Sequence, residues 1–199
     1  MAAGDLITLA ELKARLETTE DEADAVLNAV ITGASAAIAQ HTSRLYVPEA
    51  GATKVRAASA WPSGGLWIGD IRTVTSVAVQ DADGVTTATL TGSDFVLEPR
   101  SRVTGPAYAI RPKSTVSAAL GTDYALSITG DWGWAAVPAH VVEACVTTCR
   151  AWLRQDGARW AGIPDPGGDY MVAPTPAPTW MLPMAAKQLL QNDRIRGVA

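Results

Sequence analysis

The sequence contains few of the residues that build disulfide frameworks, metal centres or catalytic sites. It has two cysteines and two histidines in 199 residues, and charged residues make up only 18 % of the chain. Cys145 and Cys149 are one turn apart in a helical pattern, a geometry that disfavours a disulfide between them. The sequence therefore predicts no disulfide framework and a reducing compartment.

Long apolar runs and an excess of basic residues are also missing. No stretch of about eighteen consecutive apolar residues occurs, which predicts that no helix spans a membrane. Asp5 precedes any basic or long apolar stretch, so the N-terminus does not resemble a signal peptide. The formal net charge is −4 and the pI is about 5.1, which excludes the broad basic surface of a general nucleic-acid binder.

The composition is that of a folded globular protein. Hydrophobic residues make up 48 % of the chain, which argues against disorder. The length allows one ordinary domain, or one domain that carries an insertion.

No motif for catalysis or metal binding is present in the sequence. His140 lies on the opposite side of its predicted helix from Cys145 and Cys149, so these three side chains do not converge on one metal ion. His41 falls in the last turn of another helix, where a structural role is expected. Residues 81–84 (DADG) lack the distal glutamate of an EF-hand and predict a hairpin turn. We therefore expect no catalytic residue, metal site, cofactor or enzymatic activity.

Three amphipathic helices are predicted near the two ends of the chain. Thr8 with Glu11, and Thr19 with Glu22, have the spacing of capping boxes, and helices follow to about residues 16 and 43. Pro138 begins a third helix that ends near Gly157. One shared core is expected to bury Leu12, Leu16, Val30, Ile31, Ile38, Val142, Cys145, Val146, Cys149 and Leu153. Ser35 falls on the predicted polar face.

The middle of the chain predicts short strands. Residues 71–79 alternate with period two and are rich in β-branched side chains. Residues 85–90 return after the turn at 81–84, and 95–97, 107–110 and 124–129 are further candidates. We expect a small β module of about five strands, inserted between the helices.

The C-terminal part is rich in proline and glycine between residues 156 and 181, a composition that favours extended conformations. A short final helix is predicted within residues 183–196. The expected fold class is α+β: a small helical bundle with an inserted antiparallel β module and an extended C-terminal arm. We expect helices in 1–46, the β module in 47–137, the completing helix in 138–156 and the arm in 157–199.

Seven tryptophans are the unusual feature of the composition. Trp152 falls on the predicted core face of its helix. Trp132 and Trp134 flank Gly133 and would point to the same side of an extended segment. Trp160 and Trp180 lie in the Pro/Gly-rich stretch, where both an interface role and core packing are open.

The order of several short motifs resembles the head-to-tail adaptor (connector) family of tailed phages. The family has a Leu-x-Glu-x-Lys-x-Leu helix, an acidic turn and a helix that ends near Tyr-Thr-Gly-Arg, where this chain has His41 and Ser43 in place of the tyrosine and glycine. The matching segments are 6–16 (LITLAELKARL), 20–24 (EDEAD), 41–44 (HTSR), 60–62 (AWP), 74–77 (VTSV), 81–84 (DADG), 133–138 (GWAAVP) and a tail with Leu182, Leu189, Leu190 and Arg194.

This resemblance implies a structural role in the neck of a virion. Adaptors form a ring, typically of twelve subunits, beneath the portal protein. The ring extends the DNA channel and binds a stopper or tail-completion protein, and gene transfer agents use the same part. DNA would pass through the channel without specific binding, no membrane is involved, and assembly would occur in the host cytoplasm.

The C-terminal arm is the predicted contact with the portal protein or a neighbouring subunit. Its partner-binding residues would be Trp180, Leu182, Leu189, Leu190, Arg194 and Arg196. On this hypothesis, deletion of residues 180–199 leaves a chain that still folds; in the alternative, the arm packs back on its own helices. A second function from another class is a glycan- or surface-binding module that uses exposed tryptophans.

Overall fold

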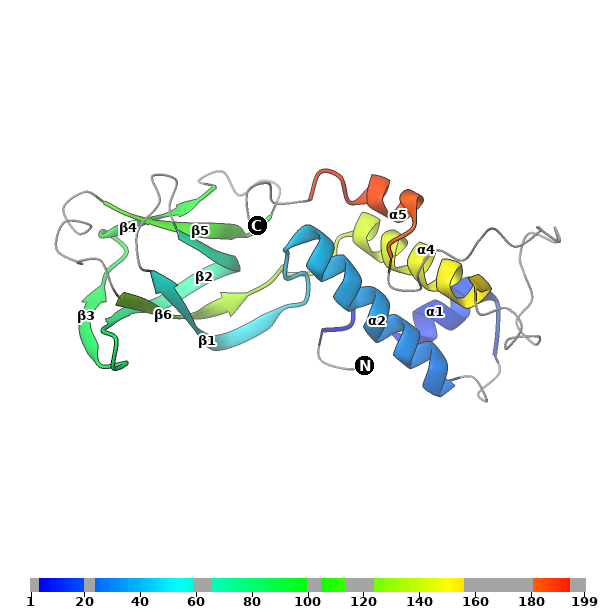
Figure 1. The fold of residues 1–199 in the computed structure, drawn as a ribbon, viewed down its shortest axis with the longest axis horizontal. Coiled ribbons are helices and arrows are strands. Elements are labelled where there is room, and N and C mark those ends of the chain that lie inside the picture. The colour runs from blue at the N-terminus through cyan, green and yellow to red at the C-terminus, as the bar shows by residue number, and fades with distance from the viewer. Residues whose placement is uncertain are drawn as a thin grey trace. The chain divides into compact units, whose positions relative to one another are not determined.

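The computed structural model describes residues 4–19, 24–58, 66–99, 105–113, 124–155 and 181–193. They form two compact units. The described residues up to Ser43 and those from Val137 onward form a helical unit, and the segment from Arg44 to Ala136 forms a β-sheet (Figure 1). The four-part division drawn from the sequence stays a prediction.

The helical unit begins with the first predicted capping box. Glu11 N–H donates to Thr8 Oγ1 at 3.1 Å, and Thr8 N–H donates to Glu11 Oε2 at 2.7 Å. These hydrogen bonds, first that from the Thr8 backbone, hold the pKa of Glu11 below its ordinary value. The second predicted box includes Glu22, which lies outside the described residues. The helices are α1 (Leu9–Leu16), α2 (Asp24–Thr42), α4 (Ala139–Gln155) and α5 (Met184–Leu189).

The core of the helical unit contains most of the predicted residues. Leu12, Leu16, Ile31, Ile38, Cys145, Val146, Cys149 and Leu153 are buried. Val30 and Val142 are only half-buried, so their assignment to the core was wrong. No helix in the described segments is long and apolar enough to cross a bilayer.

The buried face of α2 is rotated from the predicted one and includes Ser35. Leu6 N–H donates to Ser35 Oγ at 3.0 Å, and Thr32 Oγ1 donates to Asp5 Oδ1 at 3.0 Å. The segment before α1 thus covers this side of α2 and satisfies the Ser35 hydroxyl, which allows a polar side chain to be buried. Val30 turns toward the surface in consequence.

The second unit is a six-stranded antiparallel sheet. Five strands lie in the order β1-β6-β2-β5-β4, and the sixth strand, β3, pairs with β2 in addition. β2 is long enough to pair with β5 through its first half and with β6 and β3 through its second half. The strands are β1 (Glu49–Ala58), β2 (Leu66–Gln80), β3 (Thr86–Leu90), β4 (Phe95–Glu98), β5 (Ala107–Pro112) and β6 (Tyr124–Trp132).

The sheet has a hydrophobic core of its own. Alternate residues of β6 are buried from Tyr124 to Trp132, as expected for a strand with one face in a core. Trp132 is fully buried, donates its indole N–H to Ala52 O at 2.8 Å, and lies beneath the Lys54 ammonium. The other buried members of this core are Ile68, Ile71, Val77, Val79, Leu90, Ala107, Ile110, Leu126 and Ile128.

These observations correct the predicted fold class. The protein is a mixed fold in which a six-stranded antiparallel sheet is as prominent as the helices, not a small helical bundle with a small β module. The error has a physical cause in β1, which the sequence did not predict. Seven of the ten residues of this edge strand are alanine, glycine, glutamate or lysine, which are depleted in strands, and the strand forms by pairing with β6.

Two further predictions from local sequence have different outcomes. The turn at residues 81–84 is confirmed, because Asp81 Oδ1 accepts hydrogen bonds from Asp83 N–H and Val85 N–H between β2 and β3. The extended C-terminal arm is wrong for residues 181–193. In this segment α5 packs along α4 (Figure 1), as in the alternative left open by the sequence.

Candidate interaction surface

The clearest candidate site is an apolar surface on the helical unit, built from α2, α4 and the segment that contains α5. Large apolar side chains are exposed in this segment: Met184 is 70 % exposed, Met181 44 % and Leu189 41 %. Exposed apolar groups gathered in one short stretch are typical of a protein interface.

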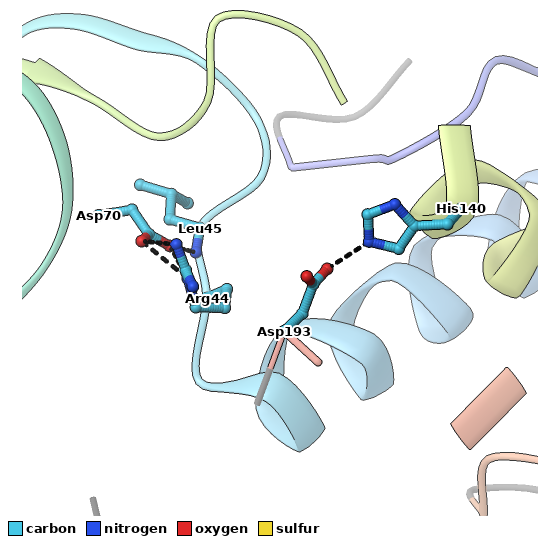
Figure 2. A network of polar contacts seen from close by, with 5 residues as sticks. All are labelled: Arg44, Leu45, Asp70, His140 and Asp193. Carbon is cyan, nitrogen blue, oxygen red and sulfur yellow. Dashed lines mark hydrogen bonds and ion pairs between the residues drawn. The ribbon is translucent and has the colours of Figure 1, made fainter. Parts of the chain in front are cut away.

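The α5 segment is held to α4 at both ends. Trp152 donates its indole N–H to Met181 O at 3.2 Å at the start of the segment. At its end, His140 Nε2 lies 2.6 Å from Asp193 Oδ2 (Figure 2). Leu182, Ala186 and Leu190 are buried between these two contacts.

The structure separates the predicted partner-binding residues into three groups. Leu182 and Leu190 are buried within the chain, and Leu189 is exposed. Trp180, Arg194 and Arg196 lie outside the described residues. A role of any of these residues in partner binding stays a prediction, and of the three that the structure describes Leu189 is the exposed one.

A groove runs along α2 beside this segment, and we call it the α2 groove. Its larger part has a volume of 490 Å³ and is lined by Ala29, Val30, Gly33, Ala36, Ala37, Gln40 and Trp152. Its smaller part, of 310 Å³, shares Ala37 and Gln40 and adds His41, Met181, Leu182 and Lys187. The lining is apolar over most of its length, which suits a hydrophobic partner surface.

Trp152 was assigned to the core from its position on the helix, and the structure places it instead at the surface of the α2 groove. It is half-buried, and its six-membered ring lies 3.1 Å from the position that a Cβ would take at Gly33. The absence of a side chain at Gly33 therefore lets the indole lie against α2. The Gly33 and Trp152 pair could not be found from sequence spacing, because it joins residues of two different helices.

The second feature, a polar cluster, lies in the sheet unit. It includes Arg44 and Gly133, which belong to the motifs 41–44 and 133–138. Arg44 Nε donates to Asp70 Oδ1 at 2.8 Å and to Oδ2 at 3.0 Å, and Leu45 N–H donates to Oδ2 at 2.7 Å (Figure 2). Asp70 O accepts from Gly133 N–H at 2.9 Å. We call these four residues the Asp70 node. It fixes the first and last chain segments of the sheet unit to the first half of β2.

Aromatic rings enclose the arginine of the Asp70 node. The Arg44 guanidinium lies 5.5 Å from the ring centre of Tyr108 and 5.3 Å from that of Trp134, and Trp134 also contacts Tyr46. Such cation–π contacts stabilise the charged guanidinium in this partly buried position. The Asp70 node is an anchor that shapes the sheet unit.

The surroundings of Trp132 and Trp134 differ from the prediction. Gly133 has a φ of +74°, so the backbone is not extended between them. Trp132 consequently lies in the core of the sheet, whereas Trp134 lies against Arg44.

The cysteines are suited to packing. Cys145 and Cys149 are both free and buried. The hydrogen bond to Cys145 and burial raise the pKa of the Cys149 thiol, so it stays protonated at neutral pH. Within the described residues, no group of three or more His, Cys, Asp or Glu side chains could hold a metal ion.

The tryptophans that the structure describes do not form an open platform for a sugar. Trp132 is buried, and Trp67, Trp134 and Trp152 are half-buried. Trp61, Trp160 and Trp180 lie outside the described segments. No observation in the described part of the chain therefore favours the alternative glycan-binding function.

Comparison with known proteins finds a structural likeness over nearly the whole chain. No protein-family model matches the sequence, and no curated protein does. A chain in the neck of an empty gene transfer agent particle, determined with six-fold symmetry, is 19 % identical with a TM-score of 0.54, covering 98 % of this chain and 92 % of that one.

Two related structures show the same likeness. A chain in the neck of the native particle, determined with twelve-fold symmetry, has 19 % identity and a TM-score of 0.54, over 98 % of this chain and 91 % of that one. A chain of the native gene transfer agent virion has 20 % identity and a TM-score of 0.53, over 98 % and 92 %. At such identities the likeness shows a shared fold, in agreement with the resemblance found in the sequence motifs.

Proposed function

We propose that this protein is a structural component of the neck of a phage-like particle or gene transfer agent, where copies of it form a ring. The observation that carries this proposal is the shared fold over 98 % of the chain with proteins of symmetric particle necks. Motifs of the adaptor family, found in the sequence in the family's order, support it independently.

The finer role that we infer is that of a head-to-tail adaptor. The ring would lie beneath the portal protein, extend the DNA channel and bind a stopper or tail-completion protein on its other side. The exposed apolar surface of α2 and α5 supports an assembly role, because a protein with such a surface is expected to cover it in a complex. The predicted residues Trp180, Leu189, Arg194 and Arg196 would contribute to the contact with the portal protein or an adjacent subunit.

The packaged DNA would pass through this ring without specific attachment. The chain has 16 Lys and Arg against 20 Asp and Glu, a net charge of −4, so acidic groups outnumber the basic groups that could hold phosphates at each step of DNA movement. We expect no sequence-specific binding of the purified protein to a DNA duplex at physiological salt. A tight complex with one defined duplex, measured by fluorescence anisotropy, would contradict this part of the proposal.

The location in the particle can be tested directly. The gene is replaced by an epitope-tagged copy in a strain that produces the particles, and purified particles are labelled with gold-conjugated antibody. Label at the junction of head and tail, and ring density at that level in electron cryomicroscopy, is the expected result. Label on the capsid shell or the tail tip, or particles without the protein, would contradict the proposal.

A further inference from the structure

The α2 groove has no charged side chain over most of its length, in a unit that carries all of the protein's net negative charge. Residues 1–43 and 137–199 contain eight Lys and Arg against twelve Asp and Glu. Between Asp24 and His41, α2 has no ionisable residue. Two copies of such an acidic unit repel each other where charges face, and an uncharged surface avoids this cost.

The outward face of α5 has the same character. Its exposed residues are Met184, Ala185, Gln188 and Leu189, and none of them is charged. Met184 has the largest exposed fraction of the large apolar side chains that the structure describes, at 70 %. The helical unit therefore presents two different uncharged surfaces: the α2 groove, which is hollowed, and the outward face of α5, whose side chains are exposed.

A closed ring of identical subunits requires two such surfaces. Each subunit contacts the next through one surface and the previous subunit through another, so the two must differ and fit each other. The proteins that share this fold occur in necks determined with six-fold and twelve-fold symmetry. A second copy of this chain is consequently the occupant of the α2 groove that the observations favour.

We propose that the α2 groove of one subunit receives the outward face of α5 of the adjacent subunit in the ring. Met184 and Leu189 would be the projecting side chains, and Trp152 with Val30 would form the apolar bottom of the groove. This inference rests on the proposed neck function and assigns the surfaces through which its ring closes. It commits the exposed side of α5 to a neighbouring copy and not to the portal protein.

Engineered cysteines test the contact in assembled particles. Ala36 lines the groove and is exposed, so Ala36→Cys combined with Met184→Cys places one thiol on each proposed surface. The native Cys145 and Cys149 are buried and give little background. A short bismaleimide is expected to link copies of the double variant into dimers and higher multimers. Each single variant is the control, as is Ala36→Cys with Val85→Cys, which uses an exposed residue of the sheet unit.

A charge in the groove gives a second, independent measurement. Ala36→Glu is expected to fold with unchanged melting but to enter particles at least about tenfold less than the wild type, because its carboxylate would be buried at the contact. Ala25→Glu makes the same change at an exposed position of α2 outside the groove and should enter normally.

The outcomes separate the two proposals. Wild-type protein in the neck together with normal entry of Ala36→Glu would overturn the groove contact and leave the neck function standing. Cross-links from the double variant to another protein of the particle, in place of a second copy, would also overturn it. Absence of the wild-type protein from the particle would overturn the neck function and this inference with it.

Discussion

The carboxylate of Asp70, in the first half of β2, forms a two-point ion pair with the guanidinium of Arg44, 26 residues earlier in the chain. Arg44 Nη2 and Nε both lie 2.8 Å from Asp70 Oδ1. Asp70 is fully buried, and the Arg44 side chain is 10 % exposed. Removal of one member of such a pair leaves a buried charge without its partner, which makes this contact a sensitive test of the fold.

Asp70→Ala is therefore expected to lower the free energy of unfolding by about 3–5 kcal/mol. Urea denaturation followed by tryptophan fluorescence measures the change. Glu98→Ala is the control, because Glu98 pairs with Arg111 at the surface, where such pairs contribute about 0–1 kcal/mol. Equal losses in the two variants would show that the Asp70 node does not stabilise the sheet unit.

Gly133→Ala should destabilise the protein more than Gly84→Ala does. Both glycines have positive φ, at +74° and +80°, so each substitution carries the cost of a left-handed alanine, about 1–2 kcal/mol. A Cβ at Gly133 would in addition lie 2.0 Å from the backbone oxygen of Val47, whereas a Cβ at Gly84 meets nothing within 4 Å. Thermal unfolding of both variants compares the two costs, and a similar loss at both positions would contradict the close approach of residues 47 and 133.

Ser43→Gly is expected to stabilise the protein slightly. Ser43 has a φ of +56°, a conformation that glycine adopts without strain, and the family pattern has a glycine at this point. The gain is limited to about 1 kcal/mol, because glycine also loses more entropy on folding. A rise in the melting temperature checks this, with Ser93→Gly on an exposed turn as the control. A fall in melting temperature for Ser43→Gly would contradict the left-handed conformation.

The rotation of α2 is tested by two neighbouring residues. Ile31 is 1 % exposed, whereas Val30 is half-buried and lines the α2 groove. Ile31→Ala is expected to lower the free energy of unfolding by about 2–5 kcal/mol. Val30→Ala should cost clearly less, because part of its side chain is in water already. If denaturant titration showed the larger loss for Val30→Ala, the face first predicted from the sequence would be the buried one.

Leu190 and Leu189 are adjacent, and substitution of each by alanine should affect stability differently. Leu190→Ala removes a fully buried side chain and is expected to cost about 2–5 kcal/mol of stability. Leu189→Ala, at an exposed position, should change stability by less than about 0.5 kcal/mol while it weakens entry into particles.

Deletion of residues 180–199 removes Leu182 and Leu190, so it should lower the melting temperature. Unchanged melting of the deletion variant would support the separate arm expected from the sequence.

Elements encoded by residues close together in the chain could be read from the sequence. The capping box at Thr8 and Glu11 depends on residues three apart, and the turn at Asp81 on residues at most four apart. The helices follow from a period that each segment carries by itself. The order of short motifs indicated a virion neck protein, and the structural comparison then found the fold of chains in gene transfer agent necks.

Contacts between distant residues were decided by the tertiary structure alone. β1 forms because β6 supplies its hydrogen-bonding partners, and Ser35 is buried because the segment at Leu6 covers it and donates a hydrogen bond. The docking of α5 depends on Leu190 and on the contact of His140 with Asp193, 53 residues apart. The sequence alone determined which segments are helices and turns, because those choices depend on local hydrogen bonds and periodicity. The tertiary structure decided which faces are buried and which apolar residues remain exposed for a partner. Both depend on packing between segments that are distant in the sequence, which a local pattern does not predict.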